Sequence, residues 1–154
     1  MKKFFFSLRS VAVLRAHRQA QAREVFSAAV HHYVQAEEAQ QRGIASQRAL
    51  EEIIATGRRT TFSAADEIAF WGAYRAACAA QVTLERAVIA ARAHMAIRRQ
   101  EYLEAHRAVK VIEQLEQKAR VDYRRASERT AQNELDELAG LRSARRLAAT
   151  TRFS

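Results

Sequence analysis

The sequence contains no proline and only four glycines among its 154 residues. Because proline breaks a helix and glycine weakens its interior, few positions in this chain can end one. The residues that dominate are alanine, arginine, glutamine, glutamate and leucine, all strong helix formers. Such a composition is typical of long helices or a coiled coil. Much of the hydrophobic fraction is alanine, which buries little area, so we do not expect a thick globular core.

The helical pattern breaks in one place, between Gly57 and Ser63. Gly57 predicts a helix C-cap, where a left-handed conformation favours glycine. Ser63, followed by Asp66, predicts an N-cap with a capping box. We therefore expect a first helix over about 8–57, a turn over 58–63 and a second helix over about 64–139.

Each expected helix carries a seam of mostly small or apolar residues at alternating spacings of three and four, as in a coiled coil. On the first helix the seam comprises Ala22, Val25, Ala29, His32, Ala36, Ala39, Gly43, Ser46, Leu50 and Ile53. On the second helix it comprises Leu84, Val88, Ala91, Met95, Arg98, Tyr102, Ala105, Val109, Ile112, Glu116, Ala119, Tyr123 and Ala126. A short turn joins the helices, so we expect them to pack antiparallel. The predicted fold is all-α, a long antiparallel two-helix coiled coil (an α-hairpin) that can kink near Gly72.

The predicted hairpin forms a single domain over residues 1–142, followed by a basic, disordered tail over 143–154. The first helix is shorter than the second, so pairing from the turn outward ends near residue 113. The rest of the second helix then lacks a partner within the chain, including Ala119, Tyr123, Ala126, Leu135, Leu138 and Leu141. An unpaired apolar stripe of this kind predicts contact with a second copy or with another protein.

The chain carries a net charge of +9, almost all of it from arginine. The arginines are scattered among glutamates along the expected helices, which is typical of solvated faces with paired charges. A basic chain can also bind nucleic acid or anionic lipid, and the opening KKFFF suits a lipid interface. The arginines form no dense block and no recognition motif, so we predict no nucleic-acid partner. Arg9 interrupts the first apolar run, which argues against a cleaved export signal.

No motif in the sequence signals catalysis. There is no phosphate-binding glycine loop and no HExxH zinc motif, and the adjacent His31 and His32 point to different helix faces. Cys78 is the one cysteine, which excludes an internal disulfide. The acidic cluster at residues 134–137 would lack a concave pocket in a two-helix hairpin. We therefore predict a non-enzymatic protein without cofactor, metal or stable small-molecule ligand.

Four motifs together resemble the FliJ family of flagellar export proteins. The first is FxFxLxxVxxLR from Phe4 to Arg15, with alternating aromatics before a helix start. The second is an aromatic start to the second helix, with Trp71, Tyr74 and Gln81. The third is RAVKVIEQLE over 107–116, which is similar to the family's K-x-x-E-K-L-x-E pattern and places Lys110, Glu113, Leu115 and Glu116 in matching roles. The fourth comprises Glu128-Arg129 and ELDELA over 134–139, so the resemblance runs from Phe4 to about Arg142.

The resemblance implies a cytoplasmic component of the flagellar type III export apparatus, peripherally associated with the inner membrane. Family members are antiparallel coiled coils similar to the central stalk of rotary ATPases. They insert a terminal end into the pore of the hexameric export ATPase, contact the export-gate membrane protein and escort chaperones of late substrates. By position, the ATPase-pore contact falls on Arg120, Tyr123, Arg124, Arg125, Arg129, Leu135 and Leu138. The export-gate contact falls on Leu50, Phe70, Tyr74, Ala77 and Gln81.

Two alternatives stay open from the sequence. One is the equivalent stalk of a virulence type III secretion system, and the other is a homo-oligomeric coiled-coil scaffold. Nucleic-acid binding is a third interpretation of the charge. A stable dimer in solution would favour the scaffold, whereas a monomer would favour a stalk.

Overall fold

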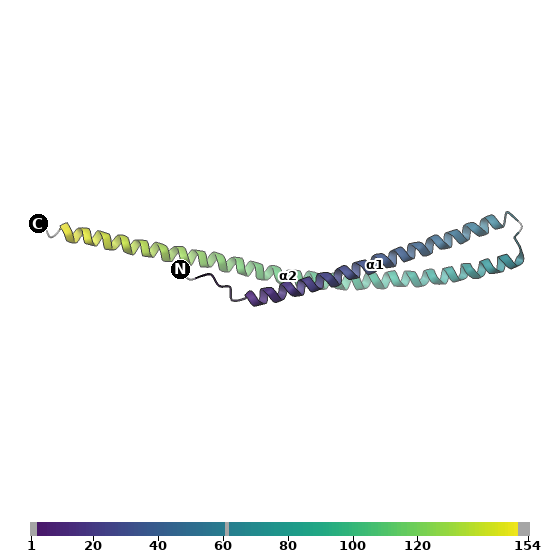
Figure 1. Cartoon of the computed structure of the whole chain (residues 1–154), viewed down its shortest axis with the longest axis horizontal. Coiled ribbons are helices and arrows are strands. Elements are labelled where there is room, and N and C mark those ends of the chain that lie inside the picture. The colour runs from purple at the N-terminus through teal and green to yellow at the C-terminus, as the bar shows by residue number, and fades with distance from the viewer. Residues whose placement is uncertain (1–2, 61, 151–154) are drawn as a thin grey trace. The chain divides into compact units, whose positions relative to one another are not determined.

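The protein consists of two long helices in a computed structural model, which describes residues 3–60 and 62–150, with side chains up to residue 146. The helices are α1 (Arg9–Gly57) and α2 (Ala64–Thr150). They pack against each other and the described residues contain no strand, so the predicted all-α hairpin is confirmed (Figure 1). The predicted helix starts, at residue 8 and residue 64, agree with these bounds within one residue.

The internal contacts of the chain divide it into two units. Unit 1 joins Met1–Arg15 to Ala108–Ser154, and unit 2 is Ala16–Arg107. The single domain predicted over residues 1–142 stays a prediction.

The turn between the helices contains the predicted capping box. The Ser63 hydroxyl accepts a hydrogen bond from the Asp66 amide at 3.2 Å. In return, the Asp66 carboxylate accepts bonds from the Ser63 amide at 3.2 Å and from the Ser63 hydroxyl at 2.7 Å. These bonds hold the pKa of Asp66 below its ordinary value, because they favour the ionised carboxylate. The first backbone donors of α2 are thus satisfied as the sequence predicts.

Gly57 ends α1 as predicted, but not in the predicted conformation. Its φ is not positive, so the left-handed cap is wrong. Gly57 is buried because the ring of Phe62 lies against it, and a Cβ there would come within 3.0 Å of Phe62 Cζ and closer still to the ring edge. The chain leaves the helix through tight turns, in which Thr60 N donates to the Gly57 carbonyl at 3.1 Å. Close approach of a ring, rather than backbone freedom, therefore requires a glycine here.

In unit 2 the two helices run antiparallel from the turn. The cross-helix pairs that mark the register are Gln47 with Tyr74, Tyr33 with Arg92, and Gln19 with His106. From one pair to the next, the residue number falls along α1 and rises by a similar amount along α2, as it does between antiparallel helices. Near the middle of the unit, Ala29 and Ala91 are buried and the rings of Phe26 and Tyr102 stack 6.0 Å apart.

The predicted seam is correct on α2 from Leu84 to Ala119, wrong at Ala126, which is exposed, and partly correct on α1. On α2, every predicted seam residue from Leu84 to Ala119 is buried or half-buried. On α1, the predicted Ala22, Ala29, Ala36, Ala39, Gly43 and Leu50 are buried or half-buried. The intervening predictions Val25, His32, Ser46 and Ile53 are exposed, and the residues after them, Phe26, Tyr33, Gln47 and Ile54, pack instead. Both registers satisfy the spacing of three and four, and the one that covers the larger rings of Phe26 and Tyr33 buries more apolar area.

The predicted end of α2 near residue 139 is wrong, because the helix continues to Thr150. The predicted disordered tail is accordingly wrong for residues 143–150, and its last four residues lie outside the described part of the chain. Residues 141–150 are mostly leucine, alanine and arginine, which favour helix over a coil. The helix also continues through Gly72, where a kink stays a prediction.

In unit 1 the start of the chain lies along α2 (Figure 1). Arg15 donates from Nη1 to the Ala108 carbonyl at 3.0 Å, and the Phe4 ring meets the Tyr123 ring edge-on at 5.5 Å. Residues 3–8 precede α1 and are not helical. Residues 3–6 are extended and cover about 3.3 Å per residue, compared with about 1.5 Å for a helix, and residues 7–8 form the turn into α1. The prediction that Ala119 and Tyr123 lack a partner within the chain is therefore wrong: Ala119 is half-buried and Tyr123 contacts Phe4.

Candidate docking surfaces

The C-terminal part of α2, in unit 1, is exposed on every side. All residues from 128 to 146 are exposed. Leu135, Leu138 and Leu141 have exposed fractions of 61%, 54% and 60% and follow one another at a spacing of three. They form an apolar strip along the helix, which we call the C-terminal strip. As predicted from the sequence, these leucines have no cover from the described part of the chain.

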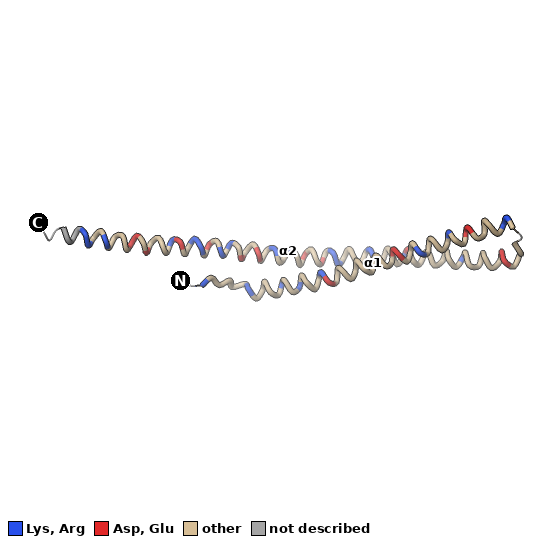
Figure 2. The backbone as a smooth tube through the Cα atoms, turned by 45° about the horizontal axis from the view of Figure 1, so that its top comes forward, with Lys and Arg blue, Asp and Glu red and all other residues tan. Residues whose placement is uncertain are grey.

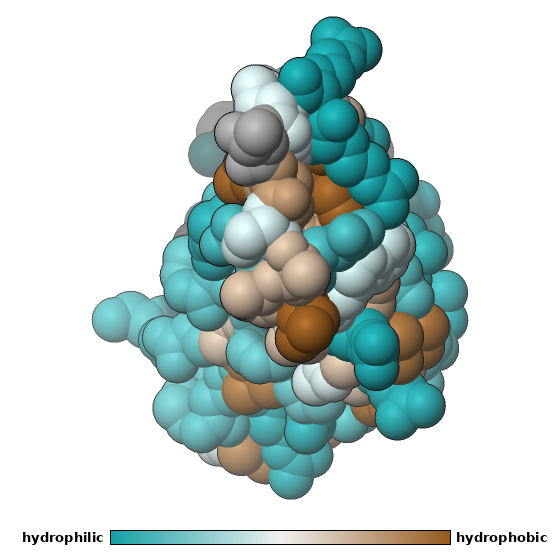
Figure 3. Space-filling model, turned by 90° about the vertical axis from the view of Figure 1, so that its right-hand side faces the viewer, coloured by the Kyte–Doolittle hydropathy of each residue, from teal (hydrophilic) through white to brown (hydrophobic). Residues whose placement is uncertain are grey.

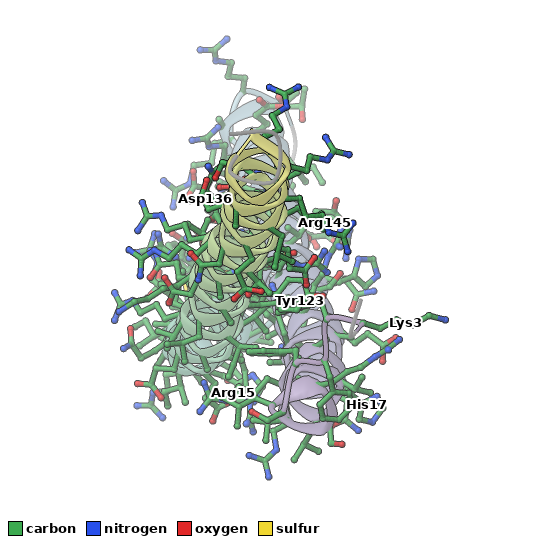
Figure 4. The ribbon with its side chains drawn as sticks, turned by 90° about the vertical axis from the view of Figure 1, so that its left-hand side faces the viewer. Lys3, Arg15, His17, Tyr123, Asp136 and Arg145 are labelled. Carbon is green, nitrogen blue, oxygen red and sulfur yellow. The ribbon has the colours of Figure 1, made fainter. Side chains whose placement is uncertain are left out.

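Charges of both signs surround the C-terminal strip. Figure 4 shows Asp136 and Arg145 pointing to opposite sides of α2. Gln132 donates to the Asp136 carboxylate at 3.0 Å along the helix, and Arg142 and Arg145 line a shallow hollow beside Leu135 and Leu138. A partner that encloses the helix would therefore meet leucines, arginines and carboxylates in turn.

The four arginines predicted to contact the ATPase pore do not share one face of α2. Arg120 and Arg124 are four residues apart and differ by about 40° around the helix axis. Arg125 and Arg129 lie about 140° and 180° from Arg120, near the opposite face. A flat partner surface could meet only one of these pairs, whereas the wall of a pore could meet both.

Arg120 differs from the other predicted pore arginines because it is already engaged within unit 1. Its guanidinium donates to the Glu116 carboxylate at 2.6 Å and lies over the Phe4 ring, 5.3 Å from the centroid. By contrast, Arg124, Arg125 and Arg129 make no hydrogen bond or ion pair within the described residues. These three side chains are therefore available to acidic groups of a partner. Arg120 could bind a partner only by giving up its contacts with Glu116 and Phe4.

The five residues predicted to contact the export gate lie in the seam of unit 2. Phe70 is buried, with an exposed fraction of 8%. Leu50, Tyr74, Ala77 and Gln81 are half-buried between the helices. A partner at this end of the hairpin could reach parts of these side chains, but Phe70 only if the helices separate. The sequence predicted the residues as a surface because it could not show which side of α2 faces α1.

Tyr74 has the most polar contacts among these five residues. Its hydroxyl accepts a hydrogen bond from Gln47 at 3.4 Å and donates to the Glu51 carboxylate at 3.0 Å. The bond from Gln47 lowers the pKa of Tyr74, but the bond to Glu51 and the negative charge of that carboxylate outweigh it and raise the pKa above its ordinary value. Tyr74 thus ties the two helices together beside the turn.

Trp71 is a surface residue that the sequence-based site prediction missed. Its ring lies 5.7 Å from Phe70 and 5.9 Å from Tyr74, yet 39% of the residue is exposed. Figure 3 looks onto the turn end of the hairpin, where hydrophobic residues lie among hydrophilic ones. Trp71 directly follows Phe70, which packs in the seam, so its side chain turns away from α1, and the sequence could not reveal this before the position of Phe70 was known.

Phe4 is the second residue that the site prediction missed. Phe4 and Phe6 are half-buried and Phe5 between them is exposed, as expected for an extended segment whose side chains alternate. The alternation of the FxF motif was visible in the sequence, but its partner on α2 was not. Unit 1 therefore has an aromatic contact at Tyr123, directly before the exposed part of α2.

The described residues contain neither a metal-binding cluster nor a membrane-spanning window. They contain no group of three or more His, Cys, Asp or Glu side chains that could hold a metal ion. Positive and negative side chains are scattered along both helices, as predicted (Figure 2). Within the described part of the chain, neither helix has an apolar window long enough to cross a membrane.

The fold and these surfaces define a helical-hairpin protein of the coiled-coil type with a long exposed helical end. The sequence gives a more specific answer: the chain belongs to the FliJ family, because the model of the flagellar FliJ protein family matches residues 4–148. This match confirms the resemblance carried by the four motifs. The chain is therefore a component of flagellar type III export, from a family whose members are non-catalytic and cytoplasmic. No curated protein and no solved structure matches the chain significantly.

Proposed function

We propose that this protein is the stalk of the flagellar export ATPase, inserting the C-terminal part of α2 into the pore of the hexamer and promoting its assembly. The observation that carries the proposal is the exposure of every residue from 128 to 146, including the three leucines of the C-terminal strip. Apolar side chains in such a stretch indicate a protein partner. A ring that surrounds the helix is the kind of partner that can contact all of its faces.

The pore contact comprises Arg120, Tyr123, Arg124, Arg125, Arg129, Leu135 and Leu138. Arg124 projects from one face of α2 and Arg125 and Arg129 from near the opposite face, and none of them makes an ion pair within the described residues, so they can meet acidic groups on different subunits of the ring. Arg120 and Tyr123 contribute where the ring reaches the Phe4 contact.

The turn end of the hairpin is the proposed contact with the export-gate membrane protein and with chaperones of late substrates. The partly accessible aromatic group of Trp71 and Tyr74 supports this assignment, since exposed aromatic rings are enriched at interfaces. Of the residues predicted for this contact, Leu50, Tyr74, Ala77 and Gln81 take part at their exposed edges, and Phe70 supports them from within the seam. Association with the gate places the protein peripherally at the inner membrane, and the stalk role requires neither catalysis nor nucleic acid.

The test is the turnover of the partner ATPase with and without this protein. The full chain should raise the hexamer population and the turnover rate, and truncation after Ser127 should abolish both effects. This truncation keeps the contacts of Phe4, Arg120 and Tyr123, so the hairpin should stay helical by circular dichroism.

Charge reversal distinguishes a specific pore contact from a general loss of the helix. The double variant R124E/R129E should weaken the stimulation, whereas R48E, at an exposed arginine of unit 2, should leave it unchanged. No rise in turnover with the full chain, or equal effects of the two variants, would count against the stalk. A stable dimer at about micromolar concentration, in place of a monomer, would favour a homo-oligomeric scaffold.

A further inference from the structure

A groove between α1 and α2 in unit 2 is not used by the proposed contacts with the ATPase and the gate. Its volume is about 670 Å³, and its floor is made of alanines from both helices, among them Ala28, Ala87 and Ala90. These three alanines are exposed, so the groove is open to solvent. An open apolar groove between two helices has the form that receives a third, amphipathic helix.

The sequence of α2 beside the groove gives a second, independent observation. Residues 87–97 read AVIAARAHMAI and contain only two polar residues, Arg92 and His94. A helix that is apolar on all sides is normally buried on all sides. Here one face packs on α1, while Ile89 and Ile97 have exposed fractions of 69% and 58%. Ile97 lies on the same side of α2 as Ala90 and His94 of the groove, since they precede it by seven and three residues.

The groups at the edge of the groove indicate the charge of its occupant. The polar side chains that line it are His32, His94 and Arg98, and no carboxylate lines it. Arg98 donates to Glu101 at 2.9 Å and to His94 Nε2 at 3.3 Å along α2, which leaves His32 and the other ring nitrogen of His94 to face the groove, with no carboxylate among the lining residues. A carboxylate of a partner could therefore accept hydrogen bonds at this edge, whereas a cationic group of a partner would find no carboxylate among the lining residues to pair with.

Shape and charge together argue against a second copy of the chain. A copy would bring a second floor of alanines, and alanine against alanine buries little area. It would also bring the same histidines and arginine against each other. Large aliphatic side chains of a partner would fill the space above these alanines best, because packed surfaces place large side chains opposite small ones.

We propose that this groove binds an amphipathic helix of another protein that carries large aliphatic side chains on one face and carboxylates along its border. Leucine, isoleucine or phenylalanine side chains of that helix would enter the space above Ala28, Ala87 and Ala90. Its carboxylates would lie toward His32, His94 and Arg98. The proposal does not depend on the stalk role, because the groove lies in unit 2, among residues that have no part in the proposed pore contact.

The test uses a labelled synthetic peptide of about 20 residues, long enough to form a helix, with leucines on one face and glutamates beside them. Fluorescence anisotropy should show binding to the full chain with a dissociation constant in the range of about 1–100 μM, typical of a short peptide contact. A matched peptide with lysine in place of glutamate should bind about tenfold more weakly.

Two variants of the protein locate the site. Ala90→Leu fills the groove and should weaken binding of the glutamate peptide at least about tenfold. Ala49→Leu makes the same change at an exposed alanine of α1 outside the groove and should leave binding unchanged. If Ala90→Leu disturbs helicity, His32→Glu at the exposed edge serves instead and should weaken binding to a similar extent.

Three results would overturn the proposal. One is the absence of saturable binding of the glutamate peptide. Another is binding that Ala90→Leu and Ala49→Leu reduce equally. The third is a dimer of the protein in sedimentation that Ala90→Leu dissociates, which would give the groove to a second copy.

Discussion

Phe4 holds the start of the chain against α2, and its replacement by alanine should release that segment without unfolding the helices. The Phe4 ring contacts Tyr123 at 5.5 Å and lies under the Arg120 guanidinium at 5.3 Å. An aromatic pair of this kind contributes about 0.5–1.5 kcal/mol, and a cation–π contact near the surface about 0.5–1 kcal/mol. With partial burial of the ring, we expect the Phe4→Ala change to cost about 2 kcal/mol, a factor of about 30 in the local opening equilibrium.

Hydrogen exchange with mass spectrometry measures this opening in the peptides that cover residues 4–12. In that region Arg9 N donates to the Phe6 carbonyl and Ala12 N to the Leu8 carbonyl, so release of the segment exposes both amides. Exchange there should accelerate about thirtyfold, while exchange in the seam of unit 2 stays constant, because local openings do not require global unfolding.

Phe5→Ala is the matched control for this experiment. Phe5 is the adjacent residue of the same type, with an exposed fraction of 82%, so its loss should leave exchange unchanged. Equal acceleration in the two variants would refute the reasoning, since it would mean that the Phe4 contacts contribute nothing specific. Unchanged exchange in Phe4→Ala would refute it as well.

Three further predictions follow from the packing and the turn. Ile112→Ala should lower the free energy of unfolding by about 2–5 kcal/mol because Ile112 is buried. Val111→Ala, at an exposed position, should change it by less than about 0.5 kcal/mol. Denaturant titration measures the free energy of unfolding of both variants. Gly57→Ala should destabilise by about 1–3 kcal/mol through collision with the Phe62 ring, while Gly140→Ala, with open space around it, should raise helicity and add up to about 1 kcal/mol, both measured by thermal unfolding. The pKa of Asp66 is depressed in the folded state, so its contribution to stability is present above the unfolded-state pKa and is lost as pH falls through the lower folded-state pKa. The wild type should therefore have a higher free energy of unfolding than Asp66→Asn by a constant amount near neutral pH, and this difference should vanish in acid. A difference that persists below pH of about 2 would contradict this.

The fold was largely predictable because its signals are local. The capping box needs only Ser63 and Asp66, and the two long helices need only composition and the absence of proline. The seam of α1 was half predictable because alternating spacings of three and four fit two registers. The choice between them depends on which side chains the second helix meets, and that information lies about sixty residues away, as in the pair of Tyr33 and Arg92.

The candidate contact surfaces were less predictable, for a related reason. Arg124 and Arg129 are exposed as the sequence suggested, since none of the residues that the structure describes covers them. By contrast, a phenylalanine such as Phe70 suits either a surface contact or the seam between the helices. Only the packing against α1 shows that Phe70 is buried in the seam. The contact of Phe4 with Tyr123 depends on the first residues leaving the helical conformation, which the strong helix formers that follow them did not reveal.

The exposed end of α2 is also the part of the helix with the least tertiary packing, since all residues from 128 to 146 are exposed. Beyond Ser127, several described side chains bond within the helix, as Thr130 does to the Ala126 carbonyl at 3.0 Å and Ser143 to the Gly140 carbonyl at 2.9 Å. Side-chain pairs along a helix contribute only about 0.2–0.5 kcal/mol each, and a glycine in the interior offsets about two of them. Helices without tertiary packing are marginal in water, so this end should open more readily than the seam. A partner that encloses it would therefore stabilise the helix as it binds, and hydrogen exchange over residues 128–146 should slow by a larger factor than exchange in unit 2 when the export ATPase is added.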